Sequence, residues 1–359
     1  MKAAVISLGS LSSKWIVDAM RKYFKSVDDL EIRAIEVTLG AKDLEVTHLG
    51  KILSGYECIY VRGSYKYAQI QSTLTAALKK ESYMPIKANA FIVGHNKFLT
   101  QLVFQQKNIP MPKSYLAVTA EGVRKVLEKI NYPIILKFPE GTQGKGVLFV
   151  ESYASASSML DALLALNQPF IIQEYVETGG VDIRAIVAGG KIVASMERKA
   201  ERMEKRANIH IGAVGEGCVL DTKTSKIAVK AAEAIGADVC AVDILESMKG
   251  PLILEVNLSP GLQGITKATK VDVADEIAKA LYKKTEEWLK TKGKEKAEEM
   301  MHRIEIGKKE ELAKEVVTSL TFRGNRILLP EIVTKMSGFS EDKEYTVRVI
   351  DGKLIIEES

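Results

Sequence analysis

Short apolar runs alternate with segments of helical periodicity over the first 85 residues. Strands are predicted in AAVISL, LEIRAIEVT and ECIYVRG, and amphipathic helices in SSKWIVDAMRKYF and KYAQIQSTLTAALKK. Strands that alternate with helices are typical of a parallel sheet covered by helices. We therefore expect residues 1–88 to form an α/β domain with a parallel sheet. No GxGxxG motif follows the first strand, so a dinucleotide site is not expected there.

Helix and strand signals continue over residues 89–285. A helix is predicted to begin near Asn96 and to end before Pro110. A strand ending at Lys137, a glycine-rich loop and another strand follow it. Two hairpins are expected, one turning at residues 189–190 and one in which CAVDIL and LILEVN flank a turn near Gly250.

The final segments differ again in charge and in the pattern of apolar residues. Residues 286–317 are charged and read as a helical linker, whereas residues 318–359 alternate short strands with one helix after Pro330 and a hairpin at 351–352. We interpret the latter as a small β-rich module. About forty residues are too few for a self-sufficient core, so the module is expected to associate with a second copy. Packing as a cap on its own chain remains the alternative.

Composition narrows the class of protein. The chain has 359 residues and a net charge of +5, with acidic and basic residues interleaved. This charge fits an anionic ligand such as a nucleotide and makes a nucleic-acid surface unlikely. No run of 18 apolar residues and no signal peptide is recognised, so we expect a cytoplasmic protein without a membrane segment. Cys58, Cys218 and Cys240 are expected to be free thiols.

A set of oxygen ligands is predicted in the hairpin of residues 243–257. Asp243 would lie opposite Glu255, and Asn257 shares a strand face with Glu255 because the two residues are two apart. Two carboxylates and an amide oxygen suit Mg²⁺, which keeps positions open for water and phosphates. Solvated strand ends are the alternative, but apolar strands rarely direct acids inward without a partner.

Several basic and glycine-rich positions are candidates for anion binding. Lys137 and the glycines that follow form a strand–loop–strand flap, in which backbone N–H groups can approach phosphate closely. Lys97 lies in the first turn of a predicted helix, where it opposes the helix dipole and so favours an anionic partner. Arg62 would hold a substrate carboxylate or be a surface-loop arginine; both interpretations stay open. Asp182 and Arg184 share one strand face.

Taken in chain order, these motifs resemble a known family. The glycine-rich flap, QEYV at 173–176, DIRA at 182–185, RANIH at 206–210 and DIL…LEVNLSPGL at 243–262 resemble the ATP-grasp superfamily, specifically the RimK-like α-L-glutamate ligases. The resemblance covers residues 1–282 and is most specific from Lys137 to Gly261. It implies an ATP-grasp fold with ATP between two α+β lobes of residues 89–285. It also implies an enzyme that joins a carboxylate to an amine through an acyl phosphate, using Mg²⁺, with Mn²⁺ as a possible substitute.

The resemblance also implies a role for each matching position. The residues expected to act on the reacting groups are Arg184, Arg198 and Arg206, and the metal ligands are Asp243, Glu255 and Asn257. The nucleotide-binding set is Lys97, Lys137, Gly141, Gly144, Gly146, Gln173, Glu174, Tyr175, Asp182 and Asn208.

Two features depart from the family pattern. The family's R-S-N-x-H-R-G segment is here R-A-N-I-H-I-G, and Ile211 stands where a substrate-side charge is expected, which puts glutamate as the added amino acid in question. The last forty residues resemble the AbrB-like swapped-hairpin domain, which dimerises and often binds DNA.

Three functions are therefore compared. The first is a ligase that adds glutamate or another amino acid to a small molecule, a peptide or a carrier protein. The second is a nucleotide-sensing regulator with a DNA-binding module, and the third is an ATP-grasp kinase. The intact acid–acid–amide set favours an enzyme over the regulator, and the kinase stays open as an alternative to the ligase. Charges in the last module nearly cancel, which disfavours nucleic acid and favours a homodimer or homotetramer.

Overall fold

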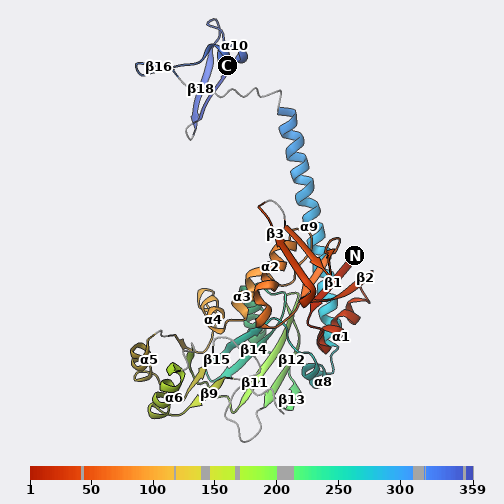
Figure 1. The fold of residues 1–359 in the computed structure, drawn as a ribbon, viewed down its shortest axis with the longest axis vertical. Helices are drawn as coiled ribbons and strands as arrows, with labels where there is room; N and C mark the ends of the chain where they lie inside the picture. The colour runs from red at the N-terminus through yellow and green to blue at the C-terminus, as the bar shows by residue number, and fades with distance from the viewer. Residues whose placement is uncertain are drawn as a thin grey trace. The chain divides into compact units, whose positions relative to one another are not determined.

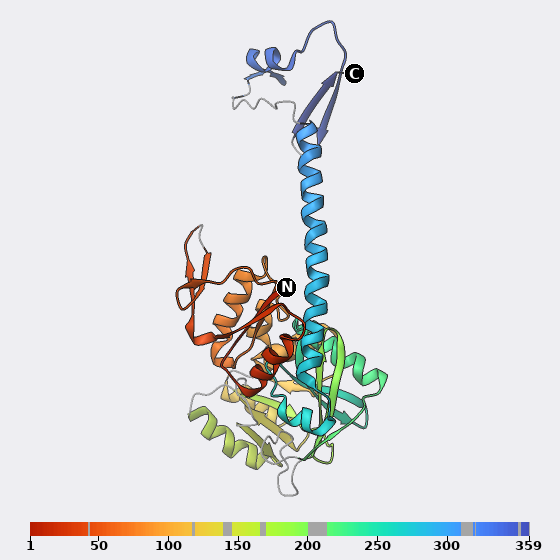
Figure 2. The same cartoon turned by 90° about the vertical axis from the view of Figure 1, so that its right-hand side faces the viewer.

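The computed structural model describes residues 1–41, 44–116, 119–138, 146–165, 170–199, 214–309, 319, 321–350 and 353–358. The chain divides into two compact units, Met1–Thr291 and Lys292–Ser359, which are described separately. Figures 1 and 2 show the elements of each unit. None of the described helices combines the length and the apolarity that crossing a membrane requires.

A parallel sheet begins the first unit, as predicted. Strand β1 (Lys2–Ser7) lies between β2 (Ser26–Glu31) and β6 (Cys58–Val61), and both neighbours run parallel to it. Helix α1 (Leu11–Met20) connects β1 to β2, and α2 (Ala68–Leu78) follows β6. A tight turn can join only antiparallel strands, so consecutive parallel strands need a longer crossover connection.

The single strand predicted at residues 30–38 is wrong. Strand β2 ends at Glu31, and the 3₁₀ turn η1 (Ile32–Ala34) follows it. The Glu31 carboxylate accepts the backbone N–H of Arg33 at 3.5 Å, which caps the turn and redirects the chain. The next strand, β3 (Ile35–Leu39), pairs antiparallel with β4 (Leu44–His48), and β4 pairs with β5 (Lys51–Ile52), in a separate sheet.

A small lobe follows helices α3 (Ala88–Gly94) and α4 (Lys97–Gln106). Its antiparallel sheet has the order β7 (Ser114–Tyr115), β10 (Ile171–Glu174), β8 (Ile134–Lys137) and β9 (Val147–Val150). Helices α5 (Ala120–Leu127) and α6 (Tyr153–Ala165) contribute Val123, Leu127, Ala156 and Leu160 to a core of its own. The flap strands β8 and β9 pair as predicted, with Lys137 opposite Val147.

The second lobe is built on a five-stranded antiparallel sheet. Its order is β13 (Val214–Gly217), β12 (Lys191–Lys199), β11 (Val181–Ala188), β14 (Val239–Ser247) and β15 (Gly250–Asn257). The predicted turn at Gly189 and Gly190 is confirmed, and their φ angles of 60° and 79° explain the choice of glycine. Helices α7 (Thr222–Ile235) and α8 (Gln263–Thr269) complete the lobe.

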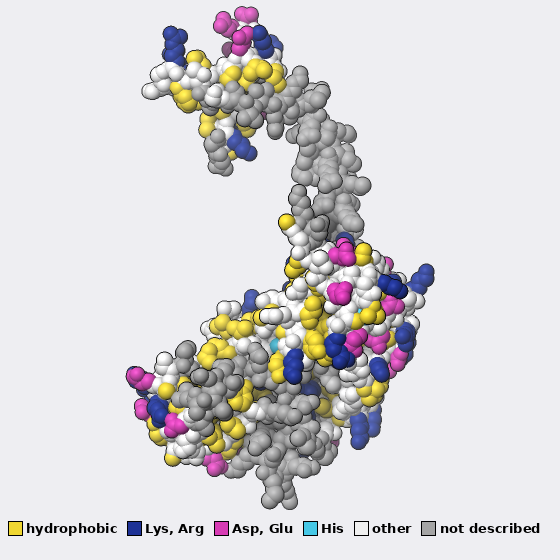
Figure 3. All heavy atoms as spheres, viewed as in Figure 1, with side chains coloured by type: hydrophobic (Ala, Val, Ile, Leu, Met, Phe, Trp, Pro, Cys, Tyr) yellow, Lys and Arg dark blue, Asp and Glu magenta, His cyan; other side chains and the backbone are white. Residues whose placement is uncertain are grey.

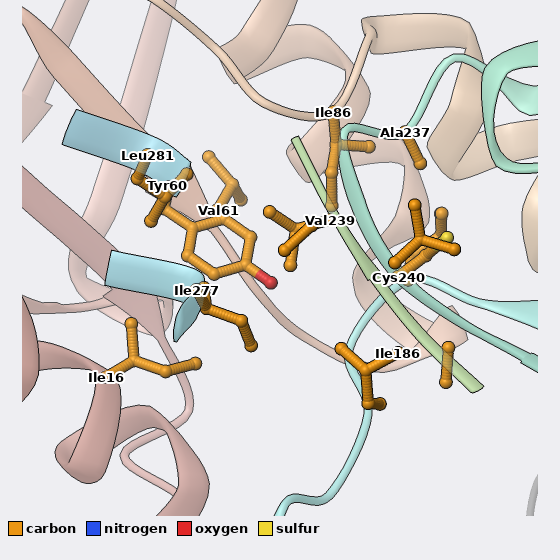
Figure 4. Close-up of a cluster of buried hydrophobic side chains, with 14 of the residues drawn as sticks. Ile16, Tyr60, Val61, Ile86, Ile186, Ala237, Val239, Cys240, Ile277 and Leu281 are labelled. Atoms are coloured by element: carbon orange, nitrogen blue, oxygen red, sulfur yellow. The ribbon is translucent and has the colours of Figure 1, made fainter. Parts of the chain in front are cut away.

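One hydrophobic core joins this lobe to the N-terminal parallel sheet. Figure 4 shows Ile16 and Tyr60 from the N-terminal region near Ile186 and Val239 of the five-stranded sheet. Helix α9 (Val273–Lys309) adds residues including Ile277 to the same core. Cys58 and Cys240 are buried and Cys218 is half-buried, and all three are free. The molecule's first unit therefore has two cores, one for the small lobe and one shared by everything around it.

The second unit contains the end of α9, then β16 (Thr321–Arg323), β17 (Arg326–Leu328), α10 (Glu331–Ser337), β18 (Tyr345–Ile350) and β19 (Lys353–Glu358). The order of strands and helix agrees with the sequence pattern, and the predicted turn at 351–352 lies outside the described residues. Large apolar side chains stay exposed, such as Phe322 at 64% and Val349 at 74%. The predicted division of the chain into four domains stays a prediction.

Candidate active site

The β14–β15 hairpin arranges the acidic residues as the sequence predicts. Asp243 pairs with Glu255, and Asn257 lies two residues further along β15. The register shifts between Asp243 and Ile244, which leaves Leu254 without a partner in a β-bulge. Consecutive residues of a regular strand point to opposite faces, yet Leu254, Glu255 and Val256 all line one cavity. The bulge explains this exception, and the apolar pattern of the sequence gives no sign of it.

This cavity has a volume of about 720 Å³. Its walls come from three regions: the carboxyl end of the N-terminal parallel sheet, the start of α4, and one face of the five-stranded sheet. The polar side chains of these walls include Ser10, Ser13, Arg62, His95, Lys97, Arg184, Arg198, Glu255 and Asn257.

A smaller cavity of about 40 Å³ adjoins it. Lys97 and Leu254 line both spaces. The remaining walls are formed by the small lobe and by the outer end of the hairpin, and they include Lys137, Val147, Gln173, Glu174, Tyr175, Val176 and Leu245. The structure therefore gathers the predicted adenine-end residues at one place.

The register of the sheet brings four charged side chains together. Arg184 on β11 pairs with Asp243 on β14, and Asp182 on β11 pairs with Arg198 on β12. Arg184 donates from Nε to Oδ1 of Asp243 at 2.8 Å and from Nη2 to Oδ2 at 2.7 Å. Arg198 binds the carboxylate of Asp182 and lies 3.0 Å from Oδ2 of Asp243. All four residues are buried.

Burial and charge oppose each other in this cluster. Burial favours a higher pKa for Asp243, but Arg184 and Arg198 outweigh it and hold the pKa below the ordinary value. Burial, with help from Asp243, raises the pKa of Asp182 to about 6, although Arg198 acts against it. Nη1 of Arg198 has no hydrogen-bond partner within the described part of the chain, and Arg198 lines the large cavity. The cluster thus places a charged guanidinium at the wall of that cavity.

Lys137 is buried at the smaller cavity, with 5% of its surface exposed. Its Nζ donates to Oε1 of Gln173 at 2.9 Å, and Nε2 of Gln173 donates to Oγ of Ser114 at 2.7 Å. Burial lowers the pKa of Lys137 to about 8, with Glu255 acting against the shift and Lys97 adding to it. A lysine held with little solvation is well suited to meet an anionic ligand.

Helix α4 begins at Lys97, as predicted from Asn96. The Asn96 Oδ1 accepts the backbone N–H groups of Phe98 and Leu99, each at 3.1 Å. The neighbouring His95 also lines the large cavity, although the sequence gave no reason to single it out. Burial, followed by the charge of Lys97, lowers the pKa of His95 to about 4, so its imidazole is neutral near pH 7.

Part of the predicted set cannot be placed. Gly141, Gly144, Arg206 and Asn208 lie outside the described residues, as does Ile211. Gly146 is described, with a φ of 79°, and a Cβ there would overlap the ring of Phe138. The glycine at the base of the flap is therefore required by space as well as by conformation.

Comparison with known proteins agrees with this geometry. Residues 94–281 match the family model described as a RimK-like ATP-grasp domain. The chain belongs to the RimK-like ATP-grasp family. A relative from Thioalkalivibrio sulfidiphilus, named a probable alpha-L-glutamate ligase, is 34% identical over 285 residues, which are 77% of this chain and 94% of the relative. A relative of the same name from Marinomonas sp. is 33% identical over 291 residues, 79% of this chain and 96% of its own.

Solved structures of the ATP-grasp type share the fold of this RimK-like chain. The ATP-grasp ligase PsnB, complexed with its minimal precursor, Mg and ADP, has a TM-score of 0.62 at 17% identity and covers 79% of this chain and 98% of its own. D-cycloserine synthetase has a TM-score of 0.58 at 18% identity and covers 79% and 100%. The predicted fold and family are confirmed, and the chain is an ATP-dependent ligase that forms carbon–nitrogen bonds. The AbrB-like assignment is not confirmed.

Sequence reasoning missed how the segment after the β14–β15 hairpin is attached. Arg62 is not a surface-loop arginine, because only 3% of its surface is exposed. Four hydrogen bonds tie residues 259–263 of this RimK-like protein to α1 and to the segment that follows β6. They join the Gly63 N–H to Ser259 Oγ at 2.9 Å, Arg62 Nη2 to the Pro260 carbonyl at 2.8 Å, the Leu262 N–H to Ser12 Oγ at 2.9 Å and Ser12 Oγ to Gln263 Oε1 at 3.0 Å.

Proposed function

We propose that this RimK-like ligase uses Mg²⁺-ATP to activate a carboxylate and adds glutamate, or another amino acid, to a small molecule, peptide or carrier protein. The observation that supports it most is the large cavity, in which two buried arginines and the Glu255–Asn257 pair share one wall. The names of the sequence relatives favour glutamate. The loss of a charge at Ile211 favours testing other amino acids beside it. A cytoplasmic location remains the expectation.

The hairpin residues fit a hard divalent cation. Glu255 and Asn257 line the cavity, and the Asn257 Oδ1 accepts the Ser259 N–H at 3.0 Å, which fixes the direction of the amide oxygen. Both oxygens of Asp243 accept from arginines, so this carboxylate would reach an ion only through its remaining lone pairs. No cluster of three or more His, Cys, Asp or Glu residues suited to a metal occurs among the described residues. Mg²⁺ suits such a sparse site because phosphates and water complete its coordination, and Mn²⁺ would substitute.

The smaller cavity fits the base of a nucleotide, with Lys137 directed to its phosphates. Val147, Leu245 and Leu254 give the cavity apolar walls, while Glu174 and Tyr175 supply strand-end backbone. Lys97 lies where this cavity meets the larger one, which is the place expected for a phosphate chain. The predicted nucleotide roles of Gln173 and Asp182 are structural in part, since each already binds a neighbouring side chain.

The proposed reaction requires the protein mainly to position the substrates and to stabilise negative charge. An oxygen of the acceptor carboxylate attacks the γ-phosphorus of ATP as the bond to ADP breaks, and the amine nitrogen then attacks the acyl carbon as phosphate leaves. Arg198 and Arg184 stabilise negative charge on the transferring group, and a bound divalent ion would neutralise the phosphates. The sheet register holds both arginines in place through Asp182 and Asp243. No covalent bond to the protein is needed.

The second unit is proposed to hold two copies of the chain together. Exposed apolar side chains occur on both of its hairpins and on α10, including Phe322, Ile332, Val347 and Val349. Figure 3 shows hydrophobic side chains on the visible face of this unit. Apolar surface on this scale in a small unit favours covering by a second copy. A homodimer or a homotetramer would satisfy it, and DNA binding is not favoured because charges of both signs are mixed there.

An ADP-release screen tests the enzymatic proposal. Purified full-length protein is incubated with Mg²⁺-ATP, candidate carboxylates and candidate amino acids, and hydroxylamine is added in parallel. We expect hydroxylamine to trap the activated carboxylate as a hydroxamate and the complete reaction to give an amide by mass spectrometry. A stable phosphorylated product instead of an amide would assign the protein to the kinase class.

A further inference from the structure

Arg62 is a buried cation with no acidic partner among the described residues. Its Nε donates to Ser13 Oγ at 3.1 Å, Nη1 donates to the Tyr60 hydroxyl at 3.0 Å and Nη2 to the Pro260 carbonyl at 2.8 Å. All three acceptors are neutral. A guanidinium has five N–H donors, so two remain after these bonds. Because a buried charge without a counter-charge is strongly unfavourable, the site is built to receive an anion.

Arg62 lies where ligands collect in a parallel sheet. It directly follows β6, and α1 follows the neighbouring β1, so both face the carboxyl edge of the sheet. Ser10, Ser13 and Arg62 all line the large cavity. Helix α1 has no acidic residue in its first turn, and its N-terminal end therefore adds positive potential to that of the arginine.

Two serines extend this cationic group. Ser13 Oγ accepts from Arg62 and lies 3.0 Å from Ser10 Oγ, and Ser10 Oγ accepts the Ser13 N–H at 3.2 Å. When Ser13 donates its hydroxyl proton to Ser10, both lone pairs of Ser10 are occupied. The hydroxyl proton of Ser10 is then available to a ligand in the cavity. Ser10 is exposed there, whereas Ser13 and Arg62 are buried.

We infer that Arg62, Ser10 and the start of α1 form a subsite for a substrate carboxylate that does not react. This inference rests on the proposed ligase function, and it specifies the substrate class: one substrate carries an acidic group remote from the reacting atoms. Arg184 and Arg198 form a different wall of the same cavity and serve the reacting group. Either the activated acid or the added amino acid supplies the remote carboxylate.

The test places a negative charge in the subsite without weakening the fold. In Ser10→Asp the new carboxylate competes with a bound anion, while Asp remains a favourable residue at a helix N-cap. The chain offers a matched control in Ser152, which precedes α6, accepts the Ser155 N–H at 3.3 Å and lies 3.1 Å from Ser155 Oγ. Ser152 lines neither cavity. Ser152→Asp therefore introduces the same charge at a similar cap elsewhere.

Binding is measured first, because it requires no turnover. The probes are dicarboxylates from malonate to adipate, each compared with its monoamide, titrated into full-length protein by calorimetry. We expect at least one dicarboxylate to bind more tightly than its monoamide. Ser10→Asp should weaken it by roughly 100-fold, the scale of juxtaposed like charges, and Ser152→Asp should not. Arg62→Gln should also remove the preference for the dicarboxylate over the monoamide.

Equal binding of every dicarboxylate and its monoamide to the wild type would overturn the subsite, as would unchanged binding by Ser10→Asp. These results are independent of whether ADP is ever released, so a failure of the proposed ligase function is seen separately in the ADP-release screen. Kinetics then identify the source of the carboxylate. A higher KM for the acid in the hydroxylamine reaction assigns the subsite to the activated acid, and a higher KM for the amino acid alone assigns it to the amine substrate.

Discussion

Replacing Lys137 with Met should make the nucleotide-free protein more stable and unable to bind ATP. Burial lowers the pKa of this lysine from 10.5 to about 8. A difference of that size corresponds to about 3 kcal/mol of unfavourable free energy for the charged form in the folded protein. Losing the hydrogen bond to Gln173 costs the variant about 1 kcal/mol of this gain. The net expectation is a gain of about 2 kcal/mol in the free energy of unfolding at pH 7.

The pH dependence gives the prediction its sign. Between pH 8 and 10.5 the folded lysine is neutral while the unfolded lysine still holds its proton. The unfolded state then binds more protons, so the stability of the wild type rises with pH across this window. This gain in wild-type stability is complete above pH 10.5 and is lost as the pH falls to 8. Met cannot titrate, so the advantage of the variant should shrink across the same range.

Urea denaturation at pH 7, 8, 9 and 10 measures both effects, with ADP titration as the binding assay. Lys125→Met is the control, because Lys125 belongs to α5 of the same lobe and its side chain is 66% exposed. Its stability should change by less than about 0.5 kcal/mol. A Lys137→Met protein that is less stable than the wild type, or that binds ADP equally well, would refute the reasoning. The same shift predicts that ADP affinity of the wild type falls as the pH rises above 8.

Four further predictions concern other parts of the molecule. Glu255→Gln should abolish ADP formation with the fold intact by circular dichroism, whereas Glu246→Gln, on an exposed position of the same hairpin, should not; normal turnover by Glu255→Gln would exclude a metal role. Arg184→Leu should lower the free energy of unfolding by about 3–5 kcal/mol, because Asp243 loses its bidentate partner; a loss below about 1 kcal/mol in urea would contradict this. Gly236→Ala should cost about 1–2 kcal/mol, since φ is 85° and a Cβ would lie 2.9 Å from Lys87 Cδ; an unchanged urea midpoint would disprove it. Removing residues 319–359 should reduce the number of chains per particle in light scattering and leave ADP formation per chain in place; an unchanged number of chains would disprove assembly through that unit.

The parts of this protein that follow from local pattern were predictable from its sequence. The Asp243–Glu255 pairing could be derived because strand alternation and a turn fix the register of a hairpin. The start of α4 followed from the capping preference of Asn96. The Leu254 bulge was not predictable, because an unpaired residue leaves the apolar pattern unchanged. The break after Glu31 was missed for a related reason, since the apolar run continues through the turn.

Contacts between residues far apart in the chain could not be predicted from the sequence either. The pairing of Arg184 with Asp243 joins residues that are 59 apart, and the sequence assigned the two to different tasks. The neutral surroundings of Arg62 depend on Pro260, 198 residues away, so nothing near Arg62 distinguished a buried guanidinium from an exposed one. His95 was missed because its environment is created by residues from several elements. Family motifs supplied the identity of the site but not these interactions.

The two cores of the first unit support different parts of the candidate active site. The small lobe, with its own core, carries Lys137 and Gln173 at the smaller cavity, where we propose that the nucleotide binds. The body built on the shared core carries Arg62 and Arg198 on two walls of the large cavity, where we propose that the other substrates bind. On this proposal, amino acid or acid specificity can change through substitutions in the body built on the shared core, without altering the small-lobe residues at the smaller cavity.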